Sequence, residues 1–200
     1  MSYNLKKSLA EAEVVPTQEM IDWFEERTRK HIERVQKMAK RLEEADPSLK
    51  GLVEQTADHD ASKFEEPERL PYIFISWQYR CKDLGIDFTP PAQIKEWMSK
   101  ATEHHVKSNR HHPEFHCSDE VGLINREDRD KPPSKLIDGS KMSRIDVAEM
   151  VADWLGMAEE KGTKAKDWAD KNVNVRWSFS DEQVADIYRL IAQIEGKAHE

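Results

Sequence analysis

Apolar residues recur in alternating steps of three and four between residues 21 and 42, which is the spacing of one face of an α-helix. The stripe reads Ile21, Phe24, Thr28, His31, Val35, Met38 and Leu42. We expect this helix to begin near Pro16-Thr17 and to end at Asp46-Pro47. His31 stands in the middle of the stripe. A histidine in this position is more often a hydrogen-bonded core residue than a metal ligand, so a ligand role needs partners from elsewhere in the chain.

The remaining pattern is also mostly helical. It predicts a short helix over about 48–57, a buried helix over 72–84, one from Pro90-Pro91 to about Asn109, one over 146–161 capped by Ser143, a short one around Trp168, and a last one with Val184, Ile187, Ile191 and Ile194 inward. Residues 173–179 alternate as a strand does, yet no partner strand is evident, so an extended covering segment is an equal reading.

The predicted fold class is therefore all-α, a single helical bundle in one domain. We expect a lead-in over residues 1–15, the helical domain over 16–195 and a tail over 196–200. Residues 116–142 are rich in Gly, Pro and Asp and predict a long irregular loop. The length of 200 residues suffices for one full hydrophobic core.

Charge and cysteine content limit the partners. The formal net charge is −8, which disfavours stable nucleic-acid binding or an anionic membrane surface but permits a local basic pocket for one small anion. The two cysteines, Cys81 and Cys117, are far apart and suit reduced thiols. No apolar run approaches about 18 residues. We expect a soluble, cytoplasmic protein, and the sequence leaves a homodimer open.

Residues 59–64 read His-Asp-Ala-Ser-Lys-Phe. His59 and Asp60 offer an imidazole and a carboxylate from adjacent positions, a combination that suits Mn, Fe, Co, Ni or Zn better than Ca or Mg. Lys63 could face the same cavity and bind an anion. We therefore expect one or two divalent transition-metal ions as cofactors.

Four of the eight histidines fall within residues 104–112. On a continuous helix, His105 and His112 would lie about 10 Å apart along the axis, too far for one ion. Pro113 disfavours helical geometry at His112, so we expect the helix to break near Asn109 to His111 and to turn the second pair inward. The pattern leaves open which of 104 and 105, and which of 111 and 112, points inward. A solvated histidine-rich surface is the alternative.

Asp153 lies in the predicted helix over 146–161. It shares a helix side with Met150 and Met157 and flanks an apolar stripe that includes Trp154. A partly buried carboxylate needs a partner, because an unpaired buried charge is costly. Either a basic side chain or a metal ion would serve.

The order His31, His59-Asp60, Asp153 resembles the HD-domain superfamily of metal-dependent phosphohydrolases. HDASK is similar to the His-Asp-x-Gly-Lys variant, with Ser62 in place of Gly, and HHPEF at 111–115 resembles the paired histidines of two-metal cyclic-dinucleotide phosphodiesterases. The chain also resembles an uncharacterised family of small bacterial and phage proteins that share HD-x-SKF, HHPE and an EM-x-x-DW run, here from Glu149 to Trp154. The mononuclear nucleotidases of the superfamily carry a Glu a few residues after His-Asp, where this chain has Lys63.

The resemblance implies roles for individual residues. The first ion would be held by His31, His59, Asp60 and Asp153, and the second by some combination of His105, His111 and His112. Asp60 would bridge two ions or accept a proton from water, and Lys63 would contact substrate oxygens. Arg110 is a weaker candidate for substrate binding. Asn109 would either donate to substrate or orient a ligand histidine, and Glu114 and Glu149 would be carboxylate partners of ligating imidazoles.

We expect the protein to be an enzyme, a phosphohydrolase that acts on a nucleotide or another small phosphate ester through a metal-activated water. Two alternatives remain open. Members of the same superfamily with four His and two Asp hold two irons and cleave C–C or C–P bonds with oxygen. A third reading is a non-catalytic nucleotide-binding module.

Overall fold

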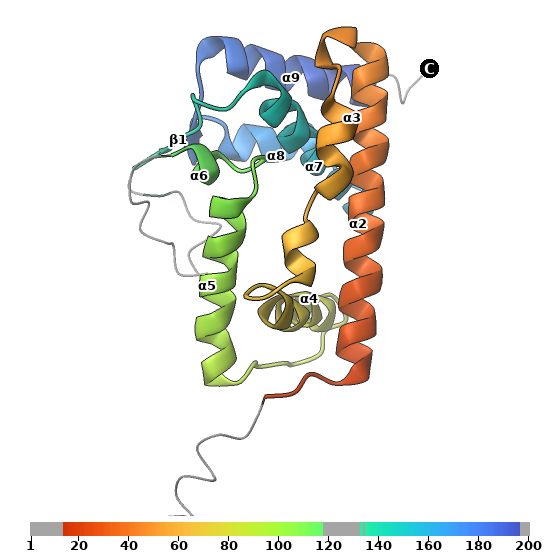
Figure 1. The fold of residues 1–200 in the computed structure, drawn as a ribbon, viewed down its shortest axis with the longest axis vertical. Helices are drawn as coiled ribbons and strands as arrows, with labels where there is room; N and C mark the ends of the chain where they lie inside the picture. The colour runs from red at the N-terminus through yellow and green to blue at the C-terminus, as the bar shows by residue number, and fades with distance from the viewer. Residues whose placement is uncertain (1–13, 118–132, 134, 197–200) are drawn as a thin grey trace, which may run out of the picture.

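In the computed structural model, which describes residues 14–117, 133 and 135–196, the chain is mostly helical, as predicted. The long helix α2 (Gln18–Ala45) runs the length of the molecule (Figure 1). Thr17 caps it, since the Thr17 side chain accepts a hydrogen bond from the Met20 backbone N–H. Both expected ends of this helix are confirmed within two residues, because the cap and Asp46-Pro47 act locally.

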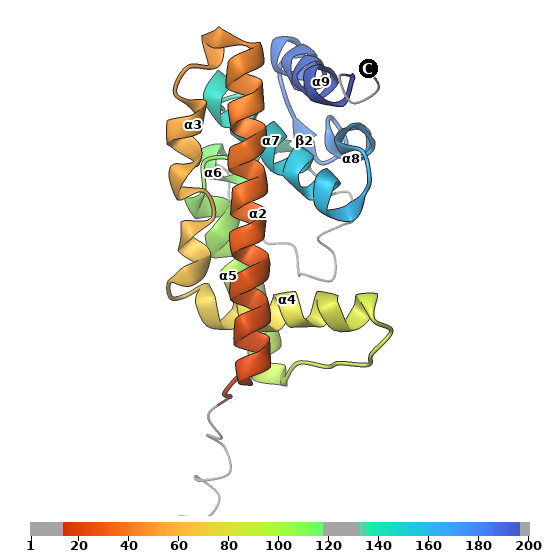
Figure 2. The same cartoon turned by 90° about the vertical axis from the view of Figure 1, so that its right-hand side faces the viewer.

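Two hydrophobic clusters pack against opposite ends of α2 (Figure 2). At one end lie α4 (Arg69–Asp83) and α5 (Ala92–Ser108), which bury Phe24 and Ile73. At the other lie α7 (Arg144–Lys161), α8 (Ala165–Asn172) and α9 (Asp181–Glu195), which bury Leu42 and Ile191. Each fully buried side chain of this size contributes roughly 1.5–3 kcal/mol. His31 lies on α2 between the two clusters.

Gly156 allows α2 and α7 to approach closely. A Cβ atom at Gly156 would lie 3.3 Å from both the backbone N and the Cγ2 of Val35. Val35 follows His31 by one turn on α2, and Gly156 follows Asp153 by one turn on α7. The close crossing therefore sets Asp153 opposite His31.

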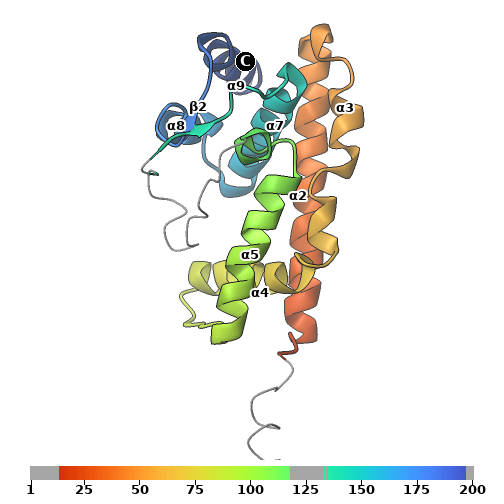
Figure 3. The ribbon, with the colours of Figure 1, turned by 60° about the vertical axis from the view of Figure 1, so that its left-hand side comes forward.

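The chain between α2 and α4 consists of short pieces that run beside α2 (Figure 3). They are η1 (Pro47–Leu49), α3 (Leu52–Gln55), η2 (Thr56–Asp58) and η3 (Ala61–Phe64). The single helix expected over 48–57 is thus wrong. Gly51 adopts φ = +100°, a left-handed conformation that interrupts helical geometry and suits glycine.

A two-stranded parallel sheet completes the fold. Strand β1 (Ile137–Asp138) pairs with β2 (Trp177–Ser178), with Ile137 opposite Trp177. The extended segment around residue 177 therefore has a partner strand. The predicted loop over 116–142 contains β1, and its residues 118–132 and 134 lie outside the described part of the chain, as do 1–13 and 197–200. Among the described residues, no helix has the length and apolarity needed to cross a bilayer.

Candidate metal centre

Three segments remote in sequence meet between the two hydrophobic clusters. His31 comes from α2 and Asp153 from α7, and His59 and Asp60 come from the turn between η2 and η3. His31 Nε2 lies 3.2 Å from Asp153 Oδ1 and 3.4 Å from Asp60 Oδ2. One nitrogen or oxygen from each of His31, His59 and Asp153 lies within 4.8 Å of the others. We call these three residues, with Asp60 Oδ2, subsite A.

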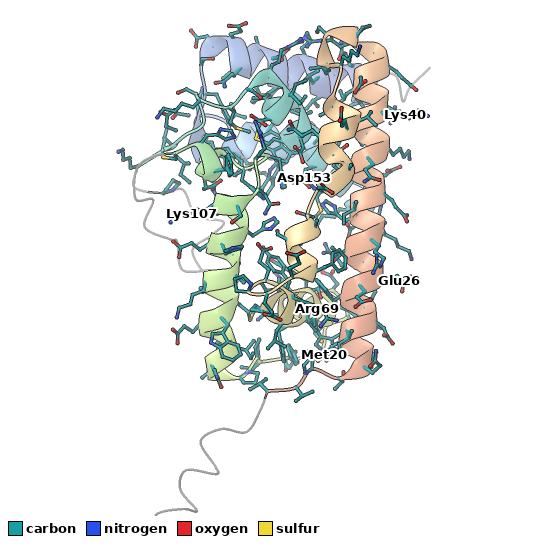
Figure 4. The ribbon with its side chains drawn as sticks, viewed as in Figure 1. Met20, Glu26, Lys40, Arg69, Lys107 and Asp153 are labelled. Atoms are coloured by element: carbon teal, nitrogen blue, oxygen red, sulfur yellow. The ribbon has the colours of Figure 1, made fainter. Side chains whose placement is uncertain are left out.

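Asp153 is labelled in Figure 4, in the middle of the molecule. The labelled side chains of Glu26 and Lys40, in contrast, project from the outer face of α2 and are exposed. Subsite A thus faces the interior of the bundle. Only 7% of the His31 side chain and 19% of the Asp153 side chain is exposed, so both groups are largely withdrawn from water.

A second cluster lies on the other side of Asp60. The imidazoles of His105, His111 and His112 each offer one nitrogen, and these nitrogens lie within 4.8 Å of one another. Asp60 Oδ1 is 3.2 Å from His105 Nε2 and 3.8 Å from His111 Nε2. We call the three histidines, with Asp60 Oδ1, subsite B. A single carboxylate therefore presents one oxygen to each subsite.

Asp60 holds this position through an unusual backbone. Its φ is 60° and its ψ 11°, in the left-handed region that Asp and Asn tolerate better than other non-glycine residues. The turn aims the carboxylate between α2 and α5 and places Lys63 back over it, with Lys63 Nζ 2.5 Å from Asp60 Oδ2. The same ammonium lies 5.2 Å from the centre of the Tyr72 ring. Such strained positions concentrate at functional sites.

The expected break at the end of α5 brings the second histidine pair inward. Asn109 has extended backbone angles, and its N–H donates to the His105 carbonyl. The His112 ring centre then lies 5.0 Å from that of His105. The structure also resolves the pairs: His105 is buried, whereas 43% of the His104 side chain is exposed, and both His111 and His112 join subsite B.

Buried carboxylates pair with the Nδ1 atoms of three of these imidazoles. Glu149 Oε1 lies 2.9 Å from His59 Nδ1 and 3.5 Å from His111 Nδ1, and Gln55 donates to the other Glu149 oxygen at 2.7 Å. Glu68 Oε2 lies 2.9 Å from His105 Nδ1. An imidazole whose Nδ1–H donates to a carboxylate turns its Nε2 lone pair to the opposite side, as in metal sites of proteins.

Sequence reasoning anticipated Glu149 as such a partner and missed Glu68. Glu149 lies one helical turn before Asp153, so the two point to the same region of α7. No spacing rule connects Glu68 with His105, which is 37 residues further on. Only the packing of α4 against α5 brings them together.

Within the described part of the chain, several buried polar atoms in the two subsites have no hydrogen-bond partner. They are His59 Nε2, Asp60 Oδ1, His112 Nε2 and His31 Nδ1. An unsatisfied buried group costs about 1–3 kcal/mol. A cation in each subsite would pair with the first three, so the donor set fits a metal centre better than it fits a closed hydrogen-bond network.

The two subsites differ in charge. Burial lowers the pKa of His31, but hydrogen bonds to Asp153 and Asp60 outweigh it and raise the pKa to about 9. Burial raises the pKa of both carboxyls, but the Lys63 ammonium beside Asp60 and the His31 imidazole beside Asp153 outweigh it and hold both pKa values below their usual range. In subsite B, burial and the neighbouring His111 and His105 hold the pKa of His112 well below its usual value. Subsite A is thus rich in charge, and His112 is kept neutral.

Two further candidates have other partners. Arg110 Nε donates to Asp146 Oδ1 at 3.0 Å, and 57% of its side chain is exposed. Glu114 was expected to contact an imidazole, but Glu114 Oε1 accepts a hydrogen bond from Trp177 Nε1 at 3.1 Å. The expectation failed because Pro113 starts the short helix α6 (Pro113–His116), which turns Glu114 toward β2.

Asn109 supports subsite B from behind. Its Nδ2 donates to the His105 carbonyl at 2.8 Å and to Ser62 Oγ at 3.0 Å. Of the two roles considered for Asn109, this geometry favours orienting a histidine over binding substrate.

Comparison with known proteins adds a family but no activity. No curated protein and no solved structure matches the chain. Residues 20–193 match the model of DUF5662, described as a family of unknown function, and the chain therefore belongs to that family.

Proposed function

We propose that this protein is a metal-dependent phosphohydrolase of the HD type that acts on a nucleotide or another small phosphate ester. One observation carries the proposal: Asp60 lies between two buried histidine clusters and presents one carboxylate oxygen to each. A carboxylate shared in this way is the arrangement that a two-metal hydrolytic site needs. The resemblance of the His31, His59-Asp60, Asp153 order to the HD superfamily supports the same reading.

Each subsite would hold one divalent ion. Subsite A offers His31, His59, Asp153 and Asp60 Oδ2, and subsite B offers His105, His111, His112 and Asp60 Oδ1. Mixed imidazole and carboxylate ligands favour Mn, Fe, Co, Ni or Zn. Bound ions of this kind lower the pKa of a coordinated water and polarise a phosphoryl oxygen.

The chain's own residues would position the reactants. Lys63 carries the charge for a substrate phosphate: 18% of its side chain is exposed, and its ammonium lies at the edge of subsite A, beside Asp60. Glu149 orients one imidazole of each subsite, because it contacts both His59 and His111. Arg110 is the weaker phosphate ligand, since its guanidinium is already paired with Asp146.

The oxygenase reading has less support. The six-ligand set of the di-iron oxygenases has four His and two Asp, whereas the two subsites here bring together five His and two Asp, His112 being the additional imidazole. No observation specifically favours the non-catalytic module.

Elemental analysis of the purified protein, followed by a phosphate-release screen over nucleotides and small phosphate esters with Mn, Co or Ni, tests the proposal. We expect up to two ions per chain and released phosphate. Lys63→Met should keep the metal and lose most phosphate release, whereas Arg110→Met, at the weaker phosphate ligand, should keep the metal and lose less phosphate release. Bound iron with oxygen consumption would favour the oxygenase, and tight nucleotide binding without product would favour the binding module.

A further inference from the structure

Glu68 is a fully buried carboxylate that the proposed chemistry does not use. Its residue is 0% exposed, and it occupies the N-cap position of α4. A side chain there normally accepts a hydrogen bond from the first turn of its helix. Glu68 makes no such bond. Its carboxylate is instead turned away from α4 and toward the end of α5.

Three side chains hydrogen-bond to this carboxylate. Glu68 Oε2 accepts from Ser62 Oγ at 3.0 Å and lies 2.9 Å from His105 Nδ1. Glu68 Oε1 lies 2.7 Å from His104 Nδ1. No Lys or Arg among the described residues pairs with Glu68, and the neighbouring Arg69 pairs with Glu25. The imidazoles and one hydroxyl therefore offset the cost of burying the charge.

We propose that Glu68 is the positioning residue of subsite B. This inference rests on the proposed metal-dependent function. By accepting from His105 Nδ1–H, Glu68 fixes the tautomer of His105 whose Nε2 lone pair faces Asp60 Oδ1, 3.2 Å away. His104 contacts the other oxygen of Glu68 from the surface and is not itself a ligand.

The assignment also gives Ser62 a role. Ser62 stands where the related HD variant has Gly, and its hydroxyl links Asn109 Nδ2 to Glu68 Oε2. A glycine could not make this link. Ser62 thereby connects the metal-ligand turn at 59–60 to the carboxylate that orients His105, 43 residues later in the chain.

Glu68 and Glu149 contact histidines of different subsites, and this difference makes the proposal testable. Glu149 contacts His59 of subsite A and His111 of subsite B, whereas Glu68 contacts a ligand of subsite B alone. Loss of Glu68 should therefore weaken one ion, and loss of Glu149 should weaken both.

The experiment titrates purified wild-type protein, stripped of metal, with Co²⁺ and measures stoichiometry and affinity by calorimetry and by the visible spectrum of the bound ion. In Glu68→Gln we expect one of two ions to bind roughly 10- to 100-fold more weakly and the other to bind as in wild type. Glu149→Gln should weaken both. Glu114→Gln, a buried carboxylate paired with an indole, is the matched control and should bind both ions as wild type does.

Histidine ¹⁵N spectra of the wild-type protein add a measurement that needs no folded variant. They should show His105 protonated at Nδ1 and unprotonated at Nε2. Wild-type affinity for both ions in folded Glu68→Gln, or a proton on Nε2 of His105, would overturn the role of Glu68 while leaving the proposed function intact. Failure of the wild-type protein to bind Co²⁺ would overturn both.

Discussion

Subsites A and B share Asp60 but are built in opposite ways. Subsite A takes its candidate ligands from α2, from the turn before η3 and from α7, which lie far apart in the sequence. Subsite B takes its three histidines from residues 105–112, one helix end and the turn that follows it. A local break in a helix can assemble the second kind of site, but only the packing of α2 against α7 can assemble the first.

The chemical difference follows the structural one. Two carboxylates, from Asp60 and Asp153, surround the imidazole of His31, so that subsite A attracts a proton when no metal competes for it. In subsite B, burial and the neighbouring histidines lower the pKa of His112, so that this ring disfavours an added proton. We therefore expect the two subsites to respond differently to substitution and to pH.

The largest expected effect comes from the residue that the subsites share. Asp60→Asn should abolish phosphate release and bind neither ion with wild-type affinity. The loss should exceed the roughly 10- to 100-fold cost of removing an outer carboxylate partner. Asn tolerates the left-handed backbone at position 60, so helix content by circular dichroism should stay the same. Asp58→Asn, at an exposed neighbouring position, is the control. Full turnover of Asp60→Asn with added Mn would show that the two clusters do not act as one site.

A smaller effect should separate the subsites. Asp153→Asn should lose the ion of subsite A and keep that of subsite B, and His105→Ala should do the reverse, as measured by elemental analysis after dialysis. His104→Ala is the matched control for His105, because the exposed His104 ring lies outside the cluster. We expect it to retain two ions. Equal metal loss in His104→Ala and His105→Ala would mean that the division into two subsites is wrong.

The smallest effect is the pH dependence of the free energy of unfolding of the chelator-treated protein. The pKa of His31 is raised from 6.5 to about 9, so its stabilising contribution is complete below about 6.5 and is lost as pH rises through about 9. This loss amounts to at most roughly 3 kcal/mol. The pKa of His112 is lowered, so its contribution is complete above 6.5 and is lost as pH falls toward the folded value.

Urea unfolding between pH 5 and pH 9.5 measures the loss of stability at alkaline pH and at acidic pH, which are the alkaline and acidic limbs of the profile. His31→Gln should flatten the alkaline limb and His112→Gln the acidic one. If the loss of stability at alkaline pH persists in His31→Gln, the charge difference between the subsites arises from other residues.

Local signals predicted much of the scaffold. The helix start near Thr17, the cap at Ser143 and the break near Asn109 each depend on residues within about one helical turn, so the sequence pattern was enough to find them. The wrong prediction of a single helix over 48–57 also has a local cause. Gly51 was too weak a signal against a helical pattern, yet its positive φ divides the segment into short pieces.

The sequence by itself determined which residue types were available for the site and on which face of its helix each one lay: His31 within an apolar stripe, His59 beside Asp60, and paired histidines at a helix end. These are consequences of periodicity and of local backbone preference. The tertiary structure alone decided which of them meet. The close approach at Gly156 sets Asp153 against His31, and the packing of α4 on α5 brings Glu68 to His105. Contacts between residues 37 to more than 100 positions apart depend on how helices cross, and the side-chain spacing along each helix does not encode that crossing.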